Sequence, residues 1–253
     1  MTVDIQKASF WKRISAFMLD AIVMVILAVG CGAALSGALR FSEYNEKVQA
    51  AYTQYEEDYG ISFELTQEEY ETMLPEERDR FDEAYDALIA DQEAMYAYNM
   101  TIYLSMLITT MGILIAVILL EFVGPMMLGN GQTLGKKVFG LGVMRVDSVR
   151  LTTIQLFIRT FLGKFTIEIM IPILLVLALF FNIIGPVGLI VLGGIVLLQV
   201  ILLGVSKTNS AIHDHMAGTV VIDIASQRIF ETTDDMIEYK KKIAAEKAAR
   251  QAY

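Results

Sequence analysis

The sequence predicts an all-α integral membrane protein with four transmembrane helices, an external helical hairpin and a small cytoplasmic β element. Three observations predict this class. Hydrophobic residues make up 55% of the 253 residues and the mean hydropathy is +0.51, which is too apolar for one or two soluble domains. Several apolar runs approach or exceed the roughly 20 residues that cross a hydrocarbon core. Acidic and basic residues are also separated along the chain, which helps to assign loops to the two sides of a membrane.

Four apolar runs define the predicted spans, at residues 14–39, 100–120, 167–181 and 187–205. The first, second and fourth runs have membrane length, whereas the third is short and needs the aromatic residues before it to reach the interface. A tight turn at residues 182–186 is expected to join the third and fourth spans. The predicted division of the chain is 1–39, cytoplasmic N-terminus and first span; 40–99, acidic extracytoplasmic helical hairpin; 100–123, second span; 124–166, basic cytoplasmic loop with short strands and an interfacial helix; 167–206, hairpin of the last two spans; 207–253, cytoplasmic His-Asp segment, short strand and C-terminal helix.

Charge assigns the loops to the two sides. Lys7 and Lys12 precede the first span, and positive charge beside a first span holds that end in the cytoplasm. Residues 43–98 contain 17 acidic and three basic residues, whereas residues 124–166 have a basic excess. We therefore expect a multi-pass protein of the cell membrane with both termini cytoplasmic. Cleavage and lipidation at the single cysteine, Cys31, is the less favoured alternative, because an aspartate inside a signal core is unusual.

Residues 40–99 are too polar to enter the membrane, but their apolar residues recur at helical spacing. Val48 and Tyr52 begin one apolar stripe. Thr66 with Glu69 is typical of a capping box at a helix start. An antiparallel helical hairpin continuous with the first two spans is therefore expected, and a solvated acidic linker is the alternative.

Short elements are predicted on the cytoplasmic side. Residues 140–147 alternate as a strand does, and residues 142–146 are expected to pair with residues 220–224. Thr152 or Thr153 is expected to cap an amphipathic helix at the membrane surface. The tail at residues 234–253 is rich in Lys, Ala and Glu and predicts a soluble helix.

Asp20 is the first candidate site residue, because a carboxylate inside an apolar run costs a few kcal/mol on insertion. Arg13 lies on the same helical face, but about 10 Å away along the axis, so direct contact is not expected. Depth counting places Gln199 of the fourth span level with Asp20, and Arg13 is expected to meet Asp214 at the inner face. Two roles stay open for Asp20, a carboxylate that binds an ion or proton and a polar staple between helices.

Further polar residues are expected to form a network at the inner face: Glu121, Arg159, Glu168 and His213. The only two histidines flank Asp214, at a spacing that favours a structural role over metal ligation, so no metal site is expected. Residues 130–141 contain glycines and lysines as a phosphate-binding loop does, but their spacing does not match one, which favours a turn packed at the inner face. No cofactor and no nucleic-acid partner is expected, and the absence of a nucleophile beside a base argues against an enzyme.

Three motifs together resemble the RDD family of bacterial membrane proteins: Arg13 and Asp20 in the first span, the run Gly-Gln-Thr-Leu-Gly-Lys-Lys followed by Gly-Leu-Gly-Val after the second, and His-Asp followed by Ala-Gly-Thr-Val-Val after the last. The family is named for an arginine and two aspartates, which the resemblance maps onto Arg13, Asp20 and Asp214. The resemblance covers most of the chain except residues 40–99 and the tail. The long acidic segment is a departure, since family members usually have a shorter loop there. Transport, including cation/proton exchange, has been suggested for some members of that family, and the role of a partner subunit for others. The resemblance therefore implies one of these two roles for this chain.

Two functional hypotheses follow. The first is a small transporter or transporter subunit for a cation, proton or small solute, in which Asp20 binds the coupling ion and Arg13 with Asp214 forms an inner gate. Four spans rarely enclose a complete pathway, so this hypothesis implies a homo-oligomer or a partner membrane protein within the lipid bilayer. The second is a non-catalytic accessory protein that binds a partner through the acidic external segment.

Overall fold

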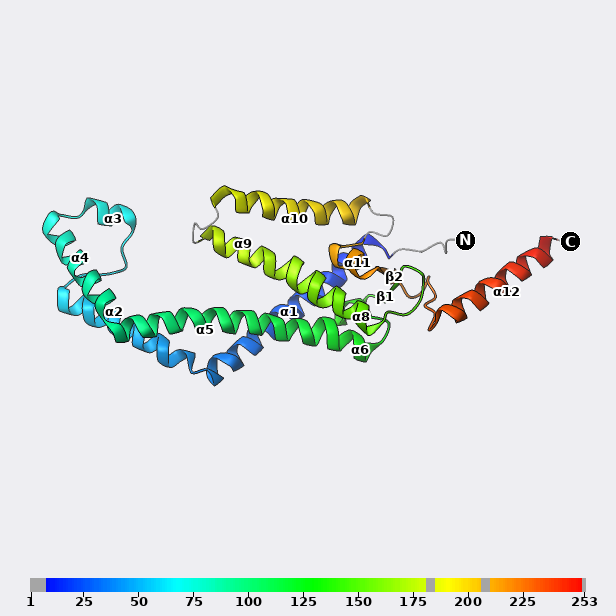
Figure 1. The fold of residues 1–253 in the computed structure, drawn as a ribbon, viewed down its shortest axis with the longest axis horizontal. Coiled ribbons are helices and arrows are strands. Elements are labelled where there is room, and N and C mark those ends of the chain that lie inside the picture. The colour runs from blue at the N-terminus through cyan, green and yellow to red at the C-terminus, as the bar shows by residue number, and fades with distance from the viewer. Residues whose placement is uncertain (1–7, 181–184, 206–209, 252–253) are drawn as a thin grey trace. The chain divides into compact units, whose positions relative to one another are not determined.

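The computed structural model describes residues 8–180, 185–205 and 210–251 (Figure 1). The chain divides into two compact units, one formed by residues 27–113 and the other by residues 1–26 together with 114–253. The elements in chain order are α1 (Phe10–Ala38), α2 (Phe41–Tyr59), α3 (Gln67–Thr72), α4 (Pro75–Ala90), α5 (Gln92–Val117), η1 (Ile118–Val123), α6 (Gly124–Leu128), α7 (Leu134–Val138), β1 (Leu141–Arg145), α8 (Thr153–Phe157), η2 (Ile158–Met170), α9 (Ile171–Phe180), α10 (Gly185–Val205), α11 (Ile212–Ala217), β2 (Thr219–Asp223) and α12 (Thr233–Gln251).

Among the described residues, three helical stretches are long and apolar enough to cross a membrane: Phe10–Ala38, Gln92–Leu128 and Gly185–Val205. They contain the first, second and fourth predicted spans. The mostly helical membrane fold predicted from the sequence is therefore confirmed at this coarser level.

The third predicted span, residues 167–181, differs from the expectation. Its α-helical part, α9, has ten residues and is preceded by the 13 residues of η2, a π-helical segment. The expected interfacial helix and the expected span form one helical stretch here, because α8, η2 and α9 follow one another without a break. The predicted turn at 182–186 lies largely outside the described residues.

Helices α2 and α4 form the core of the unit at residues 27–113. Val48 of α2 and Ala84 and Leu88 of α4 are buried. The capping box expected at Thr66 is present, since the hydroxyl accepts from the Glu69 amide and the Glu69 carboxylate accepts from the Thr66 amide. Regular helices and a packed core argue against a formless linker in this segment.

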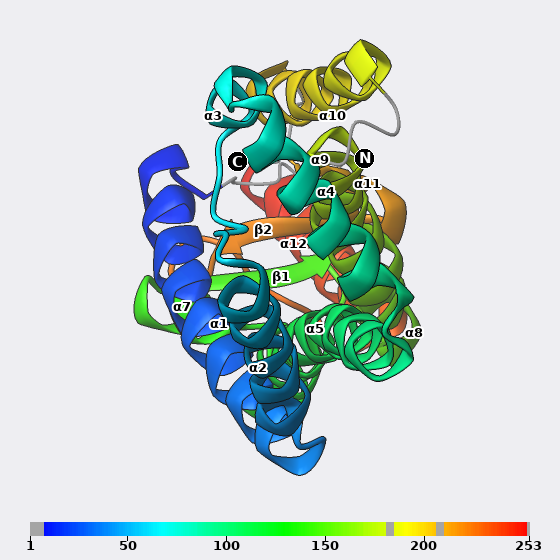
Figure 2. The ribbon, with the colours of Figure 1, turned by 90° about the vertical axis from the view of Figure 1, so that its left-hand side faces the viewer.

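Strands β1 and β2 form an antiparallel pair in the other unit, and Figure 2 shows them side by side. The register joins Val143 to Val221, and both side chains are buried. Each strand begins one residue before its predicted bounds. The chain turns back after β1 through an isolated antiparallel bridge between Met144 and Arg150.

Both π-helical segments carry buried charge. Glu121 lies in η1, and Arg159 lies in η2. Residues five apart stand one turn apart in π-helical geometry, because the backbone amide bonds the carbonyl five residues earlier. The geometry of η2 therefore brings Arg159 and Lys164 to one face, which an α-helix would not do.

Candidate functional site

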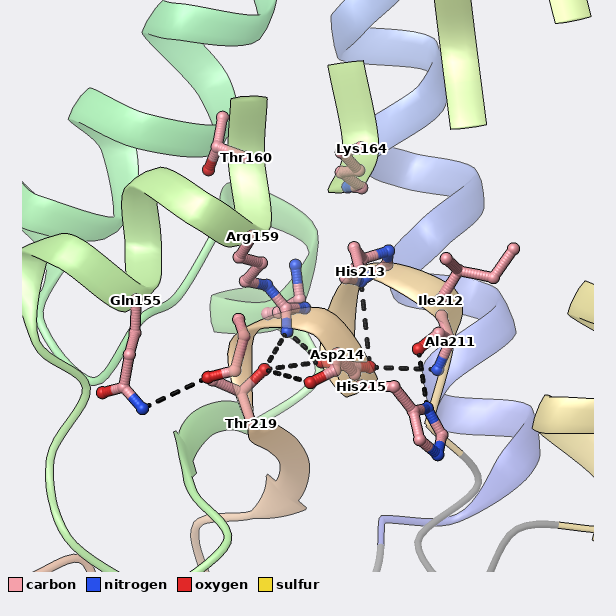
Figure 3. A network of polar contacts seen from close by, with 12 residues as sticks. Gln155, Arg159, Thr160, Lys164, Ala211, Ile212, His213, Asp214, His215 and Thr219 are labelled. Carbon is pink, nitrogen blue, oxygen red and sulfur yellow. Dashed lines mark hydrogen bonds and ion pairs between the residues drawn. The ribbon is translucent and has the colours of Figure 1, made fainter. Parts of the chain in front are cut away.

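Asp214 lies at the centre of a buried ion-pair network at the start of α11. One carboxylate oxygen pairs with the Arg159 guanidinium and accepts from the Thr219 hydroxyl at 3.1 Å. The other lies 3.4 Å from the Arg13 guanidinium and accepts from the Ala211 amide at 3.3 Å. Figure 3 shows Arg159 and Thr219 converging on Asp214. Asp214 is 0% exposed, so its charge depends on these partners.

Asp20 holds the loop before and within α7 against α1. The Thr133 hydroxyl donates to one carboxylate oxygen at 2.5 Å, and the Gly135 amide donates to the other at 2.7 Å. The Lys136 ammonium lies 3.8 Å from Asp20 and donates to the Thr133 hydroxyl at 3.0 Å. Main-chain and hydroxyl donors satisfy a carboxylate in a fixed position, so this geometry is that of a staple.

His213 connects α11 to η2 and α10. Its Nδ1 lies 2.8 Å from both carboxylate oxygens of Glu168, and its backbone amide donates to the same carboxylate at 3.2 Å. Gln199 of α10 donates to Glu168 at 3.3 Å and accepts from the Ile212 amide at 3.2 Å. This group therefore ties the last candidate span to the segment that carries Asp214.

Glu121 of η1 adds a further ion pair beside these groups. The Lys164 ammonium pairs with its carboxylate, and the Thr160 hydroxyl donates to its main-chain carbonyl at 2.8 Å. We call the whole set the charge cluster, which contains four cations and four carboxylates: Arg13, Lys136, Arg159 and Lys164, with Asp20, Glu121, Glu168 and Asp214. With His213 neutral, these formal charges balance.

A cavity of about 350 Å³ lies against the charge cluster. Seven of its lining residues belong to the cluster: Arg13, Asp20, Lys136, Arg159, Lys164, Glu168 and Asp214. His213 and Gln199 line it too, and its remaining wall is largely apolar. The volume lies at the lower end of the range for small-molecule sites in proteins. Among the described residues no group of three or more His, Cys, Asp or Glu side chains is arranged to hold a metal ion.

The structure brings together the residues singled out from the sequence, with different pairings. The expected contact between Arg13 and Asp214 is present. Asp20 and Gln199 line the same cavity, but Asp20 bonds to the loop and Gln199 to Glu168, so the expected partnership of Asp20 with Gln199 needs correction. The reason is that the loop at 130–137 returns to α1 and supplies closer donors. Sequence reasoning missed Thr133 and Lys136 as partners of Asp20, although their glycine- and lysine-containing run was noticed.

Burial and charge set the protonation of the groups outside the spans. Burial raises the pKa of the Asp214 carboxyl, but the positive charge of Arg159 and its other neighbours outweighs burial and lowers it. Burial lowers the pKa of Lys136 to about 8, with Glu121 acting in the opposite direction. Burial, with help from the charge of Arg159, lowers the pKa of His213 below its usual value, so this imidazole is neutral at pH 7.

The lowered pKa of His213 predicts a pH-dependent stability. The unfolded chain takes up a proton on this histidine as the pH falls below about 6.5, whereas the folded chain resists it. The free energy of unfolding should therefore fall by up to about 2 kcal/mol between pH 7 and pH 5. Thermal unfolding of the purified protein in detergent measures this slope, and His213→Gln should flatten it. His215→Gln is the matched control, and an unchanged slope in His213→Gln would contradict the assignment.

Three helices of membrane length and a buried, charge-balanced cluster define a class, the helical membrane proteins with a buried network of ion pairs. Within this class, the chain belongs to the RDD family, whose model matches residues 7–218. The matched range contains Arg13, Asp20 and Asp214. Comparison with curated proteins and with solved structures gives no match.

Proposed function

We propose that this RDD-family membrane protein is a small transporter, or the membrane subunit of one, in which the cavity holds a transported solute or coupling proton. The observation that carries the proposal is the cavity itself, with seven ionisable side chains of the charge cluster in its lining. Buried charges beside membrane spans are costly, and in membrane proteins they commonly mark ion or substrate pathways.

The proposed topology has four spans with both termini in the cytoplasm of a cell-membrane protein. The continuous stretch of η2 and α9 supplies the fourth span beside the three membrane-length helices. The basic excess of residues 124–166 supports a cytoplasmic position for the charge cluster, and the acidic excess of residues 43–98 supports the opposite side for α2 to α4. Because four helices rarely enclose a complete pathway, the proposal includes a homo-oligomer or a partner membrane protein.

Within this proposal, Glu168 and His213 form the proton site, and Asp20 keeps the inner loop in place. Glu168 and His213 lie 2.8 Å apart, so a proton taken up on the Glu168 carboxylate leaves an uncharged pair with the neutral imidazole. Asp20 is 4% exposed, and its carboxylate is already satisfied by a hydroxyl, a main-chain amide and a nearby ammonium. A coupling cation at Asp20 would also meet the Lys136 ammonium, which disfavours that position.

Proton flux into liposomes tests the proposal. The purified protein is reconstituted with an interior pH dye, and a potassium gradient with valinomycin sets the membrane potential. Glu168→Gln should reduce the rate of acidification by about tenfold or more, because the amide holds no exchangeable proton of this kind. Glu231→Gln is the control, since the ion pair that Glu231 makes with Arg150 in the described part of the chain is exposed. Equal flux in the Glu168→Gln and native proteins would reject the proton site.

An accessory role is the second candidate, and the separate acidic unit favours it. Residues 27–113 form their own compact unit, and residues 43–98 contain 17 carboxylates against three basic side chains. Such a surface fits a basic partner. Deleting residues 43–98 should then reproduce the phenotype of cells that lack the whole protein, whereas Glu168→Gln should leave the cells like those with the native protein. The opposite pattern supports the transporter.

A further inference from the structure

The cavity has two chemically different walls. Four large apolar side chains form one wall: Phe10, Ile14 and Phe17 of α1 and Leu203 of α10. Charged side chains from α7, η2 and α11 also line the cavity, together with Arg13 and Asp20 of α1. The apolar wall therefore comes from two membrane-length helices, α1 and α10, whereas most of the charged groups come from shorter segments. Small polar solutes gain little from the apolar wall, whereas a molecule with a polar head and an apolar chain contacts both.

The charges on the lining favour an anionic head. The lining has four cations and three carboxylates, because Glu121 contacts Lys164 from outside the cavity. The formal charge of the lining is therefore +1 with His213 neutral. The balance over the whole cluster is restored only by Glu121, which does not line the cavity.

Lys136 is the cation best placed to receive such a head. An ammonium has three donors, and among the residues that the structure describes Lys136 donates one hydrogen bond, to the Thr133 hydroxyl at 3.0 Å. Its distance of 3.8 Å from Asp20 is an ion-pair distance without a hydrogen bond, and Asp20 is already bonded to Thr133 and Gly135. Lys136 is 8% exposed, so water supplies little of the missing hydrogen bonding.

We infer that the cavity binds a single-chain amphiphile with an anionic carboxylate or phosphate head, the head against Lys136 and the chain along the apolar wall. A volume of about 350 Å³ suits one short chain and does not suit a two-chain lipid. The inference rests on the proposed function only in that it names a ligand class for the same cavity. Binding to the cavity is measured without proton flux, so the two proposals are tested separately.

Four probes with the same chain length separate the contributions of head and chain: laurate, dodecyl phosphate, dodecanol and dodecyltrimethylammonium. Each displaces a fluorescent fatty acid from the full-length protein in nanodiscs of zwitterionic lipid, with empty nanodiscs subtracted. Laurate and dodecyl phosphate should bind at least about tenfold more tightly than the other two, since a hydrogen bond to a charged group is worth that much. Comparable binding of dodecanol or dodecyltrimethylammonium would overturn the anionic head. Inorganic phosphate that displaces the probe as well as dodecyl phosphate would overturn the role of the chain.

Two variants place the ligand in this cavity. Leu203→Trp fills the apolar wall and should weaken laurate binding about tenfold or more, whereas Val200→Trp on the same helix is 60% exposed, does not line the cavity and should bind normally. Lys136→Gln should remove the preference for laurate over dodecanol. Binding that survives Leu203→Trp would exclude this cavity. Ligand binding without proton flux would reject the proposed transporter and keep the inferred amphiphile site. Proton flux without ligand binding would support the transporter and reject the amphiphile site.

Discussion

Asp214→Asn should lower the free energy of unfolding by about 3–5 kcal/mol, the typical cost of removing one partner of a buried ion pair. The carboxylate is fully buried between Arg159 and Arg13, and it also accepts from Thr219 and the Ala211 amide. The asparagine keeps the shape but removes the negative charge, so the buried Arg159 guanidinium loses its counter-charge and the partly buried Arg13 loses one partner. Thermal and urea unfolding of the detergent-purified protein measure the loss.

Asp223→Asn provides the matched control for this experiment. Asp223 pairs with Lys12 at 2.6 Å, but its side chain is 19% exposed and that of Lys12 is 48% exposed. Such a pair contributes roughly 0–1 kcal/mol, so the control should unfold close to the native protein. A second arm combines Asp214→Asn with Arg159→Gln, which removes one unpaired cation and should recover part of the loss. Equal stability of the Asp214→Asn and Asp223→Asn variants would contradict the central position of Asp214.

The regular elements could be predicted from the sequence because their signals are local. Apolar runs identified three membrane-length helices, period-two alternation identified β1, and the predicted strands at 142–146 and 220–224 lie within one residue of β1 and β2. The capping box at Thr66 is likewise a local pattern, of four residues. The π-helical geometry of η2 was not predictable, since the charged residues that favour it bond to segments far away in the chain.

Six of the eight members of the charge cluster could be predicted, all except Lys136 and Lys164, but several of its pairings could not. Polar residues at the ends of apolar runs are conspicuous, and the positive-inside rule places them on one side of the membrane. Comparing the depths of residues in the membrane predicts contacts between one span and another. It does not take account of loops that fold back onto a span. Asp20 and Thr133 are 113 positions apart, and the contact depends on how residues 130–137 return to α1. Nothing local in the sequence encodes that return.

Gly135→Ala should cost about 3 kcal/mol or more, the second large effect expected in this protein. A Cβ at Gly135 would lie 2.9 Å from the Asp20 carboxylate carbon and one of its oxygens, and still closer to the Ala16 carbonyl oxygen. Overpacking of this kind costs about 1–3 kcal/mol. The displaced loop also weakens the bond from the Gly135 amide to Asp20, and a hydrogen bond to a charged group contributes about 1.5–3 kcal/mol. Denaturant unfolding in detergent measures the sum.

Gly194→Ala is the matched control, because, apart from the backbone of its own helix, no described atom lies within 4 Å of the position where its Cβ would be. Gly194 lies inside α10, where alanine is the better helix former by up to about 1 kcal/mol, so this variant should be neutral or slightly more stable. A double-mutant cycle with Asp20→Ala isolates the close contact between residue 135 and the Asp20 carboxylate. In the absence of the carboxylate, Gly135→Ala should lower the free energy of unfolding by less, and the loss that remains reports the contact with the Ala16 carbonyl. If the two glycine variants unfold alike, the packing of α7 against α1 around Asp20 is wrong, and with it the assignment of Asp20 as a staple.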